Sequence, residues 1–196
     1  MKKALFLILA LSLAISCGRA PALTPEEKAL VPPGGGLMRV LTVDVAEDSL
    51  VLRTPCEDFR VSDLRSDCYA DLAASLIATV TSPEQDGVGI AGPQVGLSRR
   101  VIAVQRFDKP GEPFEVYPNI RITAFNGNEE LGSEGCLSVP GRRGKVMRYR
   151  NIEISYLSPR SFRDTCESVH GFTAVIFQHE CDHLDGIIYT DRLFEE

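Results

Sequence analysis

Two histidines near the end of the chain are four residues apart, in the stretch QHECDHLDG from position 178 to 186. Side chains four residues apart lie on one face of a helix, so His179 and His183 can direct ring nitrogens at a single point. Such a pair suits a divalent transition metal, which also supplies the polar partner that buried histidines need. Glu180 projects about 100° away from His179 and can reach a water on the metal without ligating it. The HExxH pattern therefore predicts a hydrolytic metal site, and the competing interpretation is a structural helix with incidental histidines.

The third metal ligand decides the class of the site. In zinc metalloproteases of the HExxH type it usually follows the motif, but only thirteen residues, with four carboxylates, come after His183. Upstream, Cys136 lies in the stretch EGCLS, and a thiolate is a good ligand for iron or zinc. The competing interpretation of Cys136 is a small buried apolar residue, as most free cysteines are.

Helices and short strands must position these residues. Apolar residues recurring at helical spacing predict a helix over 62–81 and a second one, carrying the HExxH motif, from 171 to about 184. Alternating stretches bounded by turn residues predict strands at 99–105, 114–117, 121–125, 146–149 and 152–157. Residues 40–52 are expected to be extended, and the small-residue stretch 131–141 to be a loop. The order indicates an α+β fold, with short, mostly antiparallel strands around the HExxH helix.

The composition is that of a globular protein with a packed core. Of the 196 residues, 44% are hydrophobic and 24% charged, and the formal net charge is −6. This balance does not favour direct binding of nucleic acid. The most basic cluster is expected to be a solvated strand or loop, and it consists of Arg142, Arg143, Lys145, Arg148 and Arg150. Six cysteines at irregular spacing do not predict a disulfide framework.

The amino-terminal stretch divides the chain into three parts. Residues 1–20 have two lysines before an apolar run and resemble a secretory leader, with Cys17 placed as in lipoprotein cleavage sites. Residues 21–36, rich in Pro and Gly, are expected to be a linker outside the fold, leaving 37–196 as the catalytic domain. The leader predicts export or membrane anchoring. If Met38 is the true start, the protein is expected to be cytoplasmic.

Three stretches in order, GVGIAGPQ, EGCLS and QHECDHLDG, resemble the motifs of the peptide deformylases. The resemblance extends from about Met38 to the end of the chain. It implies that Cys136, His179 and His183 bind one divalent metal, with iron(II) favoured and zinc, nickel or cobalt as alternatives. Glu180 is then expected to transfer protons during hydrolysis.

The same resemblance implies the substrate and its contacts. The substrates are expected to be N-formylmethionyl peptides or nascent chains, from which formate is released. The side chain of Gln94 and the backbone N–H of Leu137 are expected to stabilise the oxyanion. The expected contacts to the peptide are the backbone of Gly87 and Gly89, a methionine pocket of Phe172, Val175, Ile176 and Gly132, and the basic Arg143. Asp182 is expected to orient the site through hydrogen bonds without binding the metal. Glu134 is expected to be structural, tied to its loop or to Arg143.

Two alternatives to deformylation remain at this point: an HExxH metallopeptidase, and a non-enzymatic peptide-binding paralogue. A monomer is expected. One departure from the family's motif is Ala91-Gly92, where two alanines are usual, and Gly92 is expected to loosen the loop slightly.

Overall fold

The structure of the protein, a computed structural model, describes residues 20–195. Its helices are α1 (Pro25–Ala29), α2 (Ala46–Leu52), α3 (Val61–Leu64), α4 (Asp67–Val80) and α5 (Gly171–Leu184), with 3-10 turns η1 (Gly92–Val95) and η2 (Tyr189–Arg192). Its strands are β1 (Gly89–Ala91), β2 (Val101–Gln105), β3 (Phe114–Pro118), β4 (Arg121–Cys136), β5 (Val139–Leu157) and β6 (Asp164–His170). Within residues 20–195, no helix has the length and apolar character needed to span a bilayer. The leader expected at residues 1–20 lies, apart from Ala20, outside the described residues.

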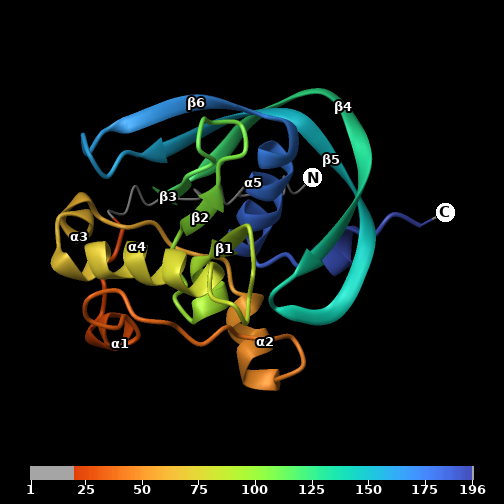
Figure 1. Cartoon of the computed structure of the whole chain (residues 1–196). Coiled ribbons are helices and arrows are strands. Elements are labelled where there is room, and N and C mark those ends of the chain that lie inside the picture. Colours follow the sequence, from red (N-terminus) through yellow and green to blue (C-terminus); the bar gives the residue numbers. More distant parts are fainter. Residues whose placement is uncertain (1–19, 196) are drawn as a thin grey trace, which may run out of the picture.

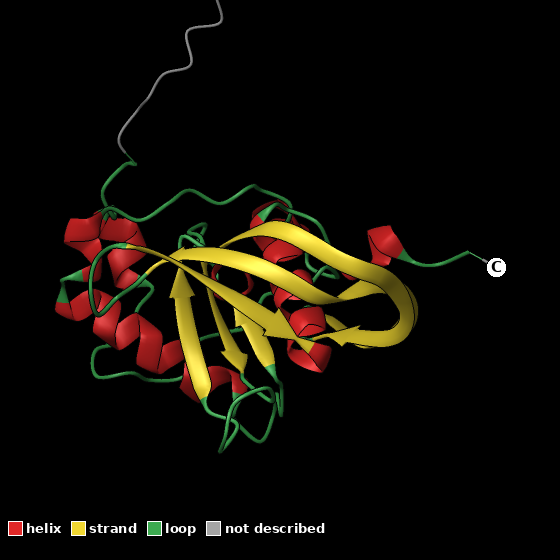
Figure 2. Cartoon of the chain, turned by 90° about the horizontal axis from the view of Figure 1, so that it is seen from above, coloured by secondary structure: helices red, strands yellow, loops and turns green. Residues whose placement is uncertain are grey.

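Helix α5 occupies the middle of the molecule, between two antiparallel sheets of order β1-β2-β3 and β4-β5-β6 (Figures 1 and 2). It contacts β1 and β2 on one side and β5 on the other. Ala174, Phe177 and Leu184 of α5 are completely buried, as are Ile152 and Ile154 of β5, which they join in one apolar cluster. The predicted α+β class, with antiparallel strands around the HExxH helix, is confirmed.

The second sheet is dominated by one long hairpin, where the sequence predicts several short strands. β4 and β5 pair antiparallel from Arg121↔Ser155 to Cys136↔Val139, with irregularities that include a bulge between Asn126 and Glu129. The predicted loop 131–141 is therefore mostly strand, and its glycines and serines are tolerated because the hairpin is largely exposed. β6 was not predicted. The hairpin brings Cys136 to a tight turn beside α5.

The first predicted helix is broken in two. Ser66 stands between α3 and α4, where its hydroxyl accepts a hydrogen bond from the Tyr69 N–H and donates one to the carbonyl of Asp63. A serine that bonds its local backbone in this way competes with the helical pattern. The predicted extended stretch 40–52 also differs, because residues 46–52 form α2.

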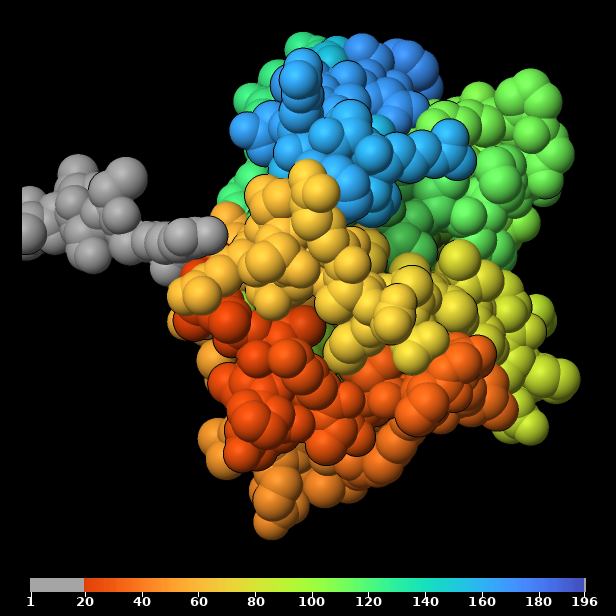
Figure 3. Space-filling model, turned by 90° about the vertical axis from the view of Figure 1, so that its left-hand side faces the viewer, coloured from red at the N-terminus to blue at the C-terminus, as the bar shows by residue number. Residues whose placement is uncertain are grey.

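Residues 21–36, expected to be a linker outside the fold, pack against the domain. α1 begins with a capping box, in which Thr24 and Glu27 exchange side-chain and backbone hydrogen bonds. Leu23 and Val31 are buried in the cluster that contains the apolar face of α4. Figure 3 shows the segment, in red, lying against the gold and yellow surface of α3 and α4. The Pro and Gly content suggested a tether, but these few apolar residues suffice to dock the segment.

The buried guanidinium of Arg99 fixes this segment to the domain. Its Nε and Nη2 donate to the two carboxylate oxygens of Glu27 at 2.6 and 2.8 Å. Its Nη1 donates to the carbonyls of Pro21 and Asp58, and Nη2 also donates to that of Ala22. A buried arginine without these acceptors would carry an uncompensated charge, so the docked segment is part of the stable fold.

We expect Glu27→Gln to lower the free energy of unfolding by about 1–3 kcal/mol, because it breaks a largely buried, charge-assisted pair. Burial works to raise the pKa of Glu27, but hydrogen bonds from Arg99 and Thr24 hold it below 4.5. A carboxyl group whose pKa is lowered by folding stabilises the protein at pH values above its pKa in the unfolded state. This stabilisation is lost as the pH falls through its pKa in the folded state. Urea unfolding at pH 7 and across pH 5–3 measures both effects. Glu26→Gln, on the exposed side of α1, is the control, and equal stabilities of the two variants would contradict the assignment.

Candidate metal centre and cleft

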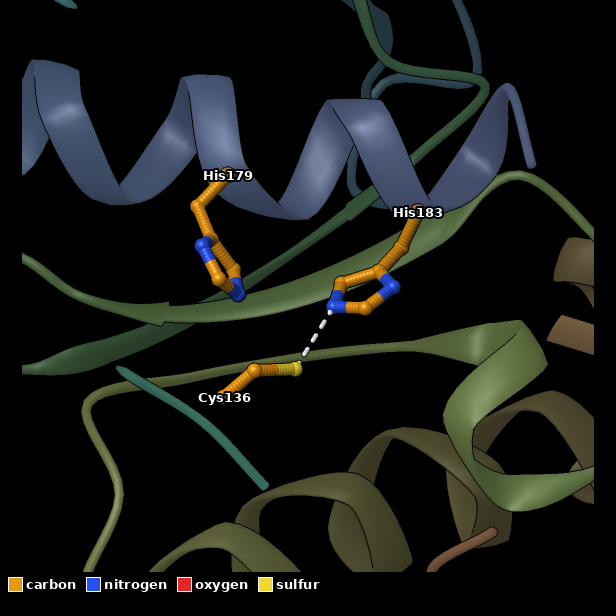
Figure 4. A group of neighbouring side chains, drawn as sticks. All are labelled: Cys136, His179 and His183. Atoms are coloured by element: carbon orange, nitrogen blue, oxygen red, sulfur yellow. Dashed lines mark hydrogen bonds between the residues drawn. The ribbon is translucent and has the colours of Figure 1, made fainter. Parts of the chain in front are cut away.

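The side chains of Cys136, His179 and His183 converge at one point between α5 and the β4–β5 turn (Figure 4). Their ligand atoms all lie within 4.8 Å of one another, and Cys136 Sγ is 3.2 Å from His183 Nε2. The histidines come from successive turns of α5, and the cysteine comes from the last residue of β4. The structure therefore brings together the three residues that the sequence predicts as metal ligands.

This donor set fits a divalent transition metal. One thiolate and two imidazoles would supply three protein ligands and leave one position open for water or substrate, as catalytic metal centres require. The two histidines are largely buried and Cys136 is partly exposed, and beside them Oε2 of the buried Glu180 carboxylate has no hydrogen-bond partner among the described residues. A buried polar atom of this kind calls for a polar or cationic partner in the same pocket.

Electrostatics favour a positive charge at the same place. Burial works to lower the pKa of His179, but the Cys136 sulfur and the Glu134 carboxylate raise it well above 6.5. Burial and the neighbouring His179 lower the pKa of His183 well below 6.5, which keeps its ring nitrogen free as a ligand. The Cys136 sulfur and the Glu134 carboxylate favour a positive charge at His179, and a metal cation could take the place of the proton there.

Glu134 orients His179 from the side away from Cys136. Its Oε2 lies 2.7 Å from His179 Nδ1, which leaves Nε2 of that ring for a metal. Arg148 donates to both oxygens of Glu134, at 2.8 and 3.2 Å, and to Asp182 at 2.7 Å. Burial works to raise the pKa of Glu134, but the bonds from His179 and Arg148 lower it to about 2. This carboxylate is thus held as an anion.

Arg148 was missed by sequence reasoning, and its basic cluster was expected to be solvated. Arg148 is buried on β5, while its neighbours Arg142, Arg143 and Arg150 are exposed or half-buried, as the strand alternates. Glu134 was expected to contact its own loop or Arg143, and it binds Arg148 instead. No pattern in the sequence distinguishes one arginine of this cluster from the others, because pairing across the long hairpin decides which one faces inward.

Glu180 is almost fully buried and faces β1. Burial raises its pKa to about 7, with His179 acting to lower that pKa and Glu134 to raise it. A divalent cation nearby lowers the pKa of a carboxyl group, so it favours the base form of Glu180.

Gly89 makes room for Glu180. A Cβ at position 89 would lie 2.5 Å from Glu180 Oε1 and 2.7 Å from Cγ2 of Ile176. Any larger residue would push the carboxylate or the helix away, so the glycine is required where β1 meets α5.

Gln94 is buried on η1 and aims its amide nitrogen at the ligand group. The Ala91 N–H donates to Gln94 Oε1 at 2.8 Å, which fixes the amide orientation. Its Nε2 then lies 3.2 Å from Ser138 Oγ and 3.6 Å from Cys136 Sγ. Ser138 was not named from the sequence, although it follows Cys136 in the EGCLS stretch. The amide can thus donate to an oxygen placed beside the metal.

Gly92 does not loosen the η1 loop. A Cβ at this position would lie 2.5 Å from the carbonyl oxygen of Arg99 and 2.8 Å from that of Leu97. The backbone of 97–99 packs directly against it, so the glycine permits a tight contact in this chain. The expectation drawn from the motif was wrong, because the close approach comes from a turn that the motif does not include.

A cavity of about 610 Å³ opens beside the ligand group. Most of the residues predicted for catalysis and peptide binding line it, namely Gly87, Gly89, Gln94, Cys136, Leu137, Arg143, Phe172, Val175, Ile176, His179 and Glu180. Gly132 does not line the cavity, and it pairs with Val146 farther along the hairpin. Val88, which precedes β1, and Val139, the first residue of β5, line it without having been predicted, since single valines carry no distinguishing signal in the sequence.

An HExxH helix whose histidines meet a thiol beside a cleft defines a metal-dependent hydrolase. The chain belongs to the polypeptide deformylase family, whose sequence pattern matches residues 39–196. It is 33% identical over 150 residues to a peptide deformylase of Leptospira biflexa, covering 73% of this chain and 82% of that protein. It is 37% identical over 145 residues to peptide deformylase 1 of Prochlorococcus marinus, covering 69% and 75%.

Solved structures agree with this assignment. The actinonin-bound class I type b peptide deformylase of Acinetobacter baumannii has a TM-score of 0.71 at 34% identity, covering 82% of this chain and all of that one. The peptide deformylase of Thermotoga maritima has a TM-score of 0.69 at 28% identity, covering 81% and 99%.

We expect Glu134→Gln to weaken metal binding about 10–100-fold, because a carboxylate on the outer nitrogen of a ligating histidine raises its basicity and fixes its orientation. Titration of the metal-free protein with Co²⁺, followed by thiolate-to-cobalt absorption, gives the Kd without reference to activity. Glu130→Gln on the same strand is the control, since Glu130 forms an exposed pair with Arg150. An unchanged Kd in Glu134→Gln would contradict this role.

Proposed function

We propose that the protein removes the N-formyl group from N-formylmethionyl peptides, in a metal-dependent hydrolysis that releases formate. The observation that carries the proposal is the position of Glu180 and the Cys136, His179 and His183 group beside one peptide-sized cleft. Membership of the deformylase family supports this activity and does not favour the metallopeptidase or the non-enzymatic alternative.

The cleft fits the end of an extended peptide. Gly87 and Gly89 offer backbone groups at its edge, where a substrate can pair as an added strand. Phe172, Val175 and Ile176 form an apolar wall for the methionine side chain. Arg143 lines the cavity and is exposed, so its guanidinium can meet the peptide or its carboxylate.

Glu180 is the proposed general base and acid. A divalent metal held by Cys136, His179 and His183 would polarise the formyl carbonyl and lower the pKa of the attacking water. The Glu180 carboxylate takes a proton from that water as the water oxygen adds to the formyl carbon. It returns the proton to the amine nitrogen as the C–N bond breaks. The products are formate and a peptide with a free amino terminus.

Gln94 and Leu137 are the proposed donors to the developing oxyanion. The amide of Gln94 is held by Ala91 and directed at the ligand group, so it needs no reorientation during the reaction. Leu137 follows the ligand Cys136 in the tight turn at the cavity wall, where its backbone N–H can supply a second donor.

Iron(II) is the proposed native metal, and zinc, nickel and cobalt suit the same donors. The proposed partners are nascent or released formyl-peptides, and the protein is proposed to act as a monomer. Membrane attachment through a leader with Cys17 stays a prediction, since Cys17 lies outside the described residues. Mass spectrometry of the native amino terminus tests it: an acylated Cys17 supports anchoring, and a chain beginning at Met38 contradicts it.

The first test is formate release from formyl-Met-Ala-Ser by anaerobically purified protein with its metal content measured. We expect release in proportion to bound metal, and no cleavage of casein. Casein cleavage without formate release would favour a metallopeptidase. Neither activity in folded, metal-loaded protein would leave peptide binding as the function.

We expect Glu180→Gln to lower kcat for formate release about 10²–10⁴-fold, because the amide cannot take a proton from water. Metal content, measured by elemental analysis, should stay the same, since Glu180 is not among the grouped ligand atoms. Undiminished turnover in this variant would show that another group is the base.

We expect Gln94→Leu to lower kcat about 10²–10³-fold with a smaller effect on KM, because the lost donor acts mainly on the transition state. Steady-state kinetics with formyl-Met-Ala-Ser separate the two parameters. The melting temperature is measured in parallel, since the Ala91 N–H loses its acceptor. A rise in KM alone would indicate a binding contact in place of an oxyanion donor.

A further inference from the structure

We propose that Phe107, which lies outside the cleft, is a specificity-determining residue that fixes the position of Phe172 in the wall of the methionine pocket. This inference rests on the proposed function, because it concerns the selection of the side chain that enters the same cleft. The observation that carries it is the ring contact between Phe107 and Phe172, whose centroids are 5.5 Å apart at an interplanar angle of 44°.

Phe172 is weakly held by its own helix. It is the second residue of α5, directly after Gly171, whose φ is +65°, and His170 gives the helix no side-chain cap. Its side chain lines the cavity and is 50% exposed. A half-exposed ring on a first helical turn can change rotamer unless a neighbour restrains it. The width of the pocket therefore depends on what stands behind Phe172.

Phe107 provides that restraint. It is half-buried and packs against the apolar cluster around α5, but it does not line the cavity. It follows β2, whose last residue, Gln105, donates its N–H to the carbonyl of Val88 in the cavity lining. The Phe107 ring thus contacts Phe172 from a turn that begins next to Val88 of the cavity lining.

The turn carrying Phe107 is closed on itself and tied to α5. The Arg106 N–H donates to the carbonyl of Pro113, which closes residues 106–113. The Asp108 N–H donates to Thr173 Oγ1 at 3.2 Å, one residue after Phe172. Arg106 also binds both oxygens of Asp108, at 2.7 and 2.8 Å. Residues 107 and 108 are therefore held on the same side as residues 172 and 173.

A buried arginine anchors the turn to two further strands. Besides Asp108, the guanidinium of Arg106 contacts Glu115 and Tyr117 of β3 and Glu167 of β6. Burial works to lower the pKa of Arg106, but its hydrogen bonds to the Asp108 and Glu167 carboxylates raise that pKa above its ordinary value. A permanently charged, multiply bonded residue at its base makes the turn a rigid support.

A fixed aromatic wall selects the side chain by width. The unbranched methionine side chain fits against a fixed Phe172 ring. If the ring could change rotamer, the pocket would bind methionine less tightly and would admit broader side chains. Phe107 is not among the residues that line the cavity with Glu180, His179 and Cys136, so its loss should act on binding more than on chemistry.

The test compares binding of two product-like peptides, Met-Ala-Ser and Ala-Ala-Ser, to metal-loaded protein by calorimetry. We expect Phe107→Ala to raise the Kd for Met-Ala-Ser about 3–10-fold, the range of one aromatic pair, and to leave that for Ala-Ala-Ser nearly unchanged. Phe107→Tyr, which keeps the ring, should restore the preference. Asp108→Ala, which keeps Phe107 but frees its turn, should shift the preference in the same direction as Phe107→Ala.

Phe125→Ala is the matched control. Phe125 pairs with Tyr149 at 5.1 Å and 43°, nearly the same ring geometry, but both residues border a separate small cavity on the β4–β5 hairpin. An equal loss of preference in Phe125→Ala, or an unchanged preference in Phe107→Ala, would overturn the inference. So would a wild-type protein that binds both peptides equally.

Activity separates this inference from the proposed function. With formyl-Met-Ala-Ser, we expect Phe107→Ala to raise KM and leave kcat nearly unchanged. If the wild-type protein releases no formate, deformylation is refuted. If that same protein prefers Met-Ala-Ser and Phe107→Ala abolishes the preference, the role of Phe107 is still supported. Normal formate release with equal KM in Phe107→Ala and wild type would support deformylation and refute the wall.

Discussion

The pairing of Glu134 with His179 and Arg148 is the interaction on which the site depends. It joins three elements, β4, β5 and α5, at one buried carboxylate. An anion buried this deeply is stable only with both partners in place, so the long hairpin and the helix must dock in one register. That register also sets Cys136 beside His183. The register that packs the hairpin against the helix therefore also fixes the positions of the candidate ligands.

Close backbone approach is the second condition of the site. Gly89 lets Glu180 come up to β1, and Gly92 lets the η1 turn close against residues 97–99. The first contact places the proposed base, and the second places Gln94. Both glycines belong to one short stretch, which explains how a segment with little side-chain chemistry of its own can position two functional groups on different elements.

Support for the cleft extends far from the cleft itself. Arg99 binds the amino-terminal segment through Glu27, and Arg106 binds the turn behind Phe172. Both arginines are buried and satisfied by several acceptors, so each converts a loop or terminal segment into a fixed part of the domain. Rigid surroundings of this kind hold a catalytic group within a narrow range of positions.

The sequence by itself indicated the candidate metal ligands, because HExxH spacing on a helix dictates where two imidazoles point and the EGCLS stretch resembles the family motif that supplies a cysteine. It also determined the α+β class and helix α5, whose periodic apolar residues are unambiguous. Tertiary structure alone decided that Arg148 faces inward, that residues 21–36 dock on the core, and that Gly132 lies away from the cavity. These features depend on pairing between segments far apart in the chain, and local patterns do not encode which distant partner will be met.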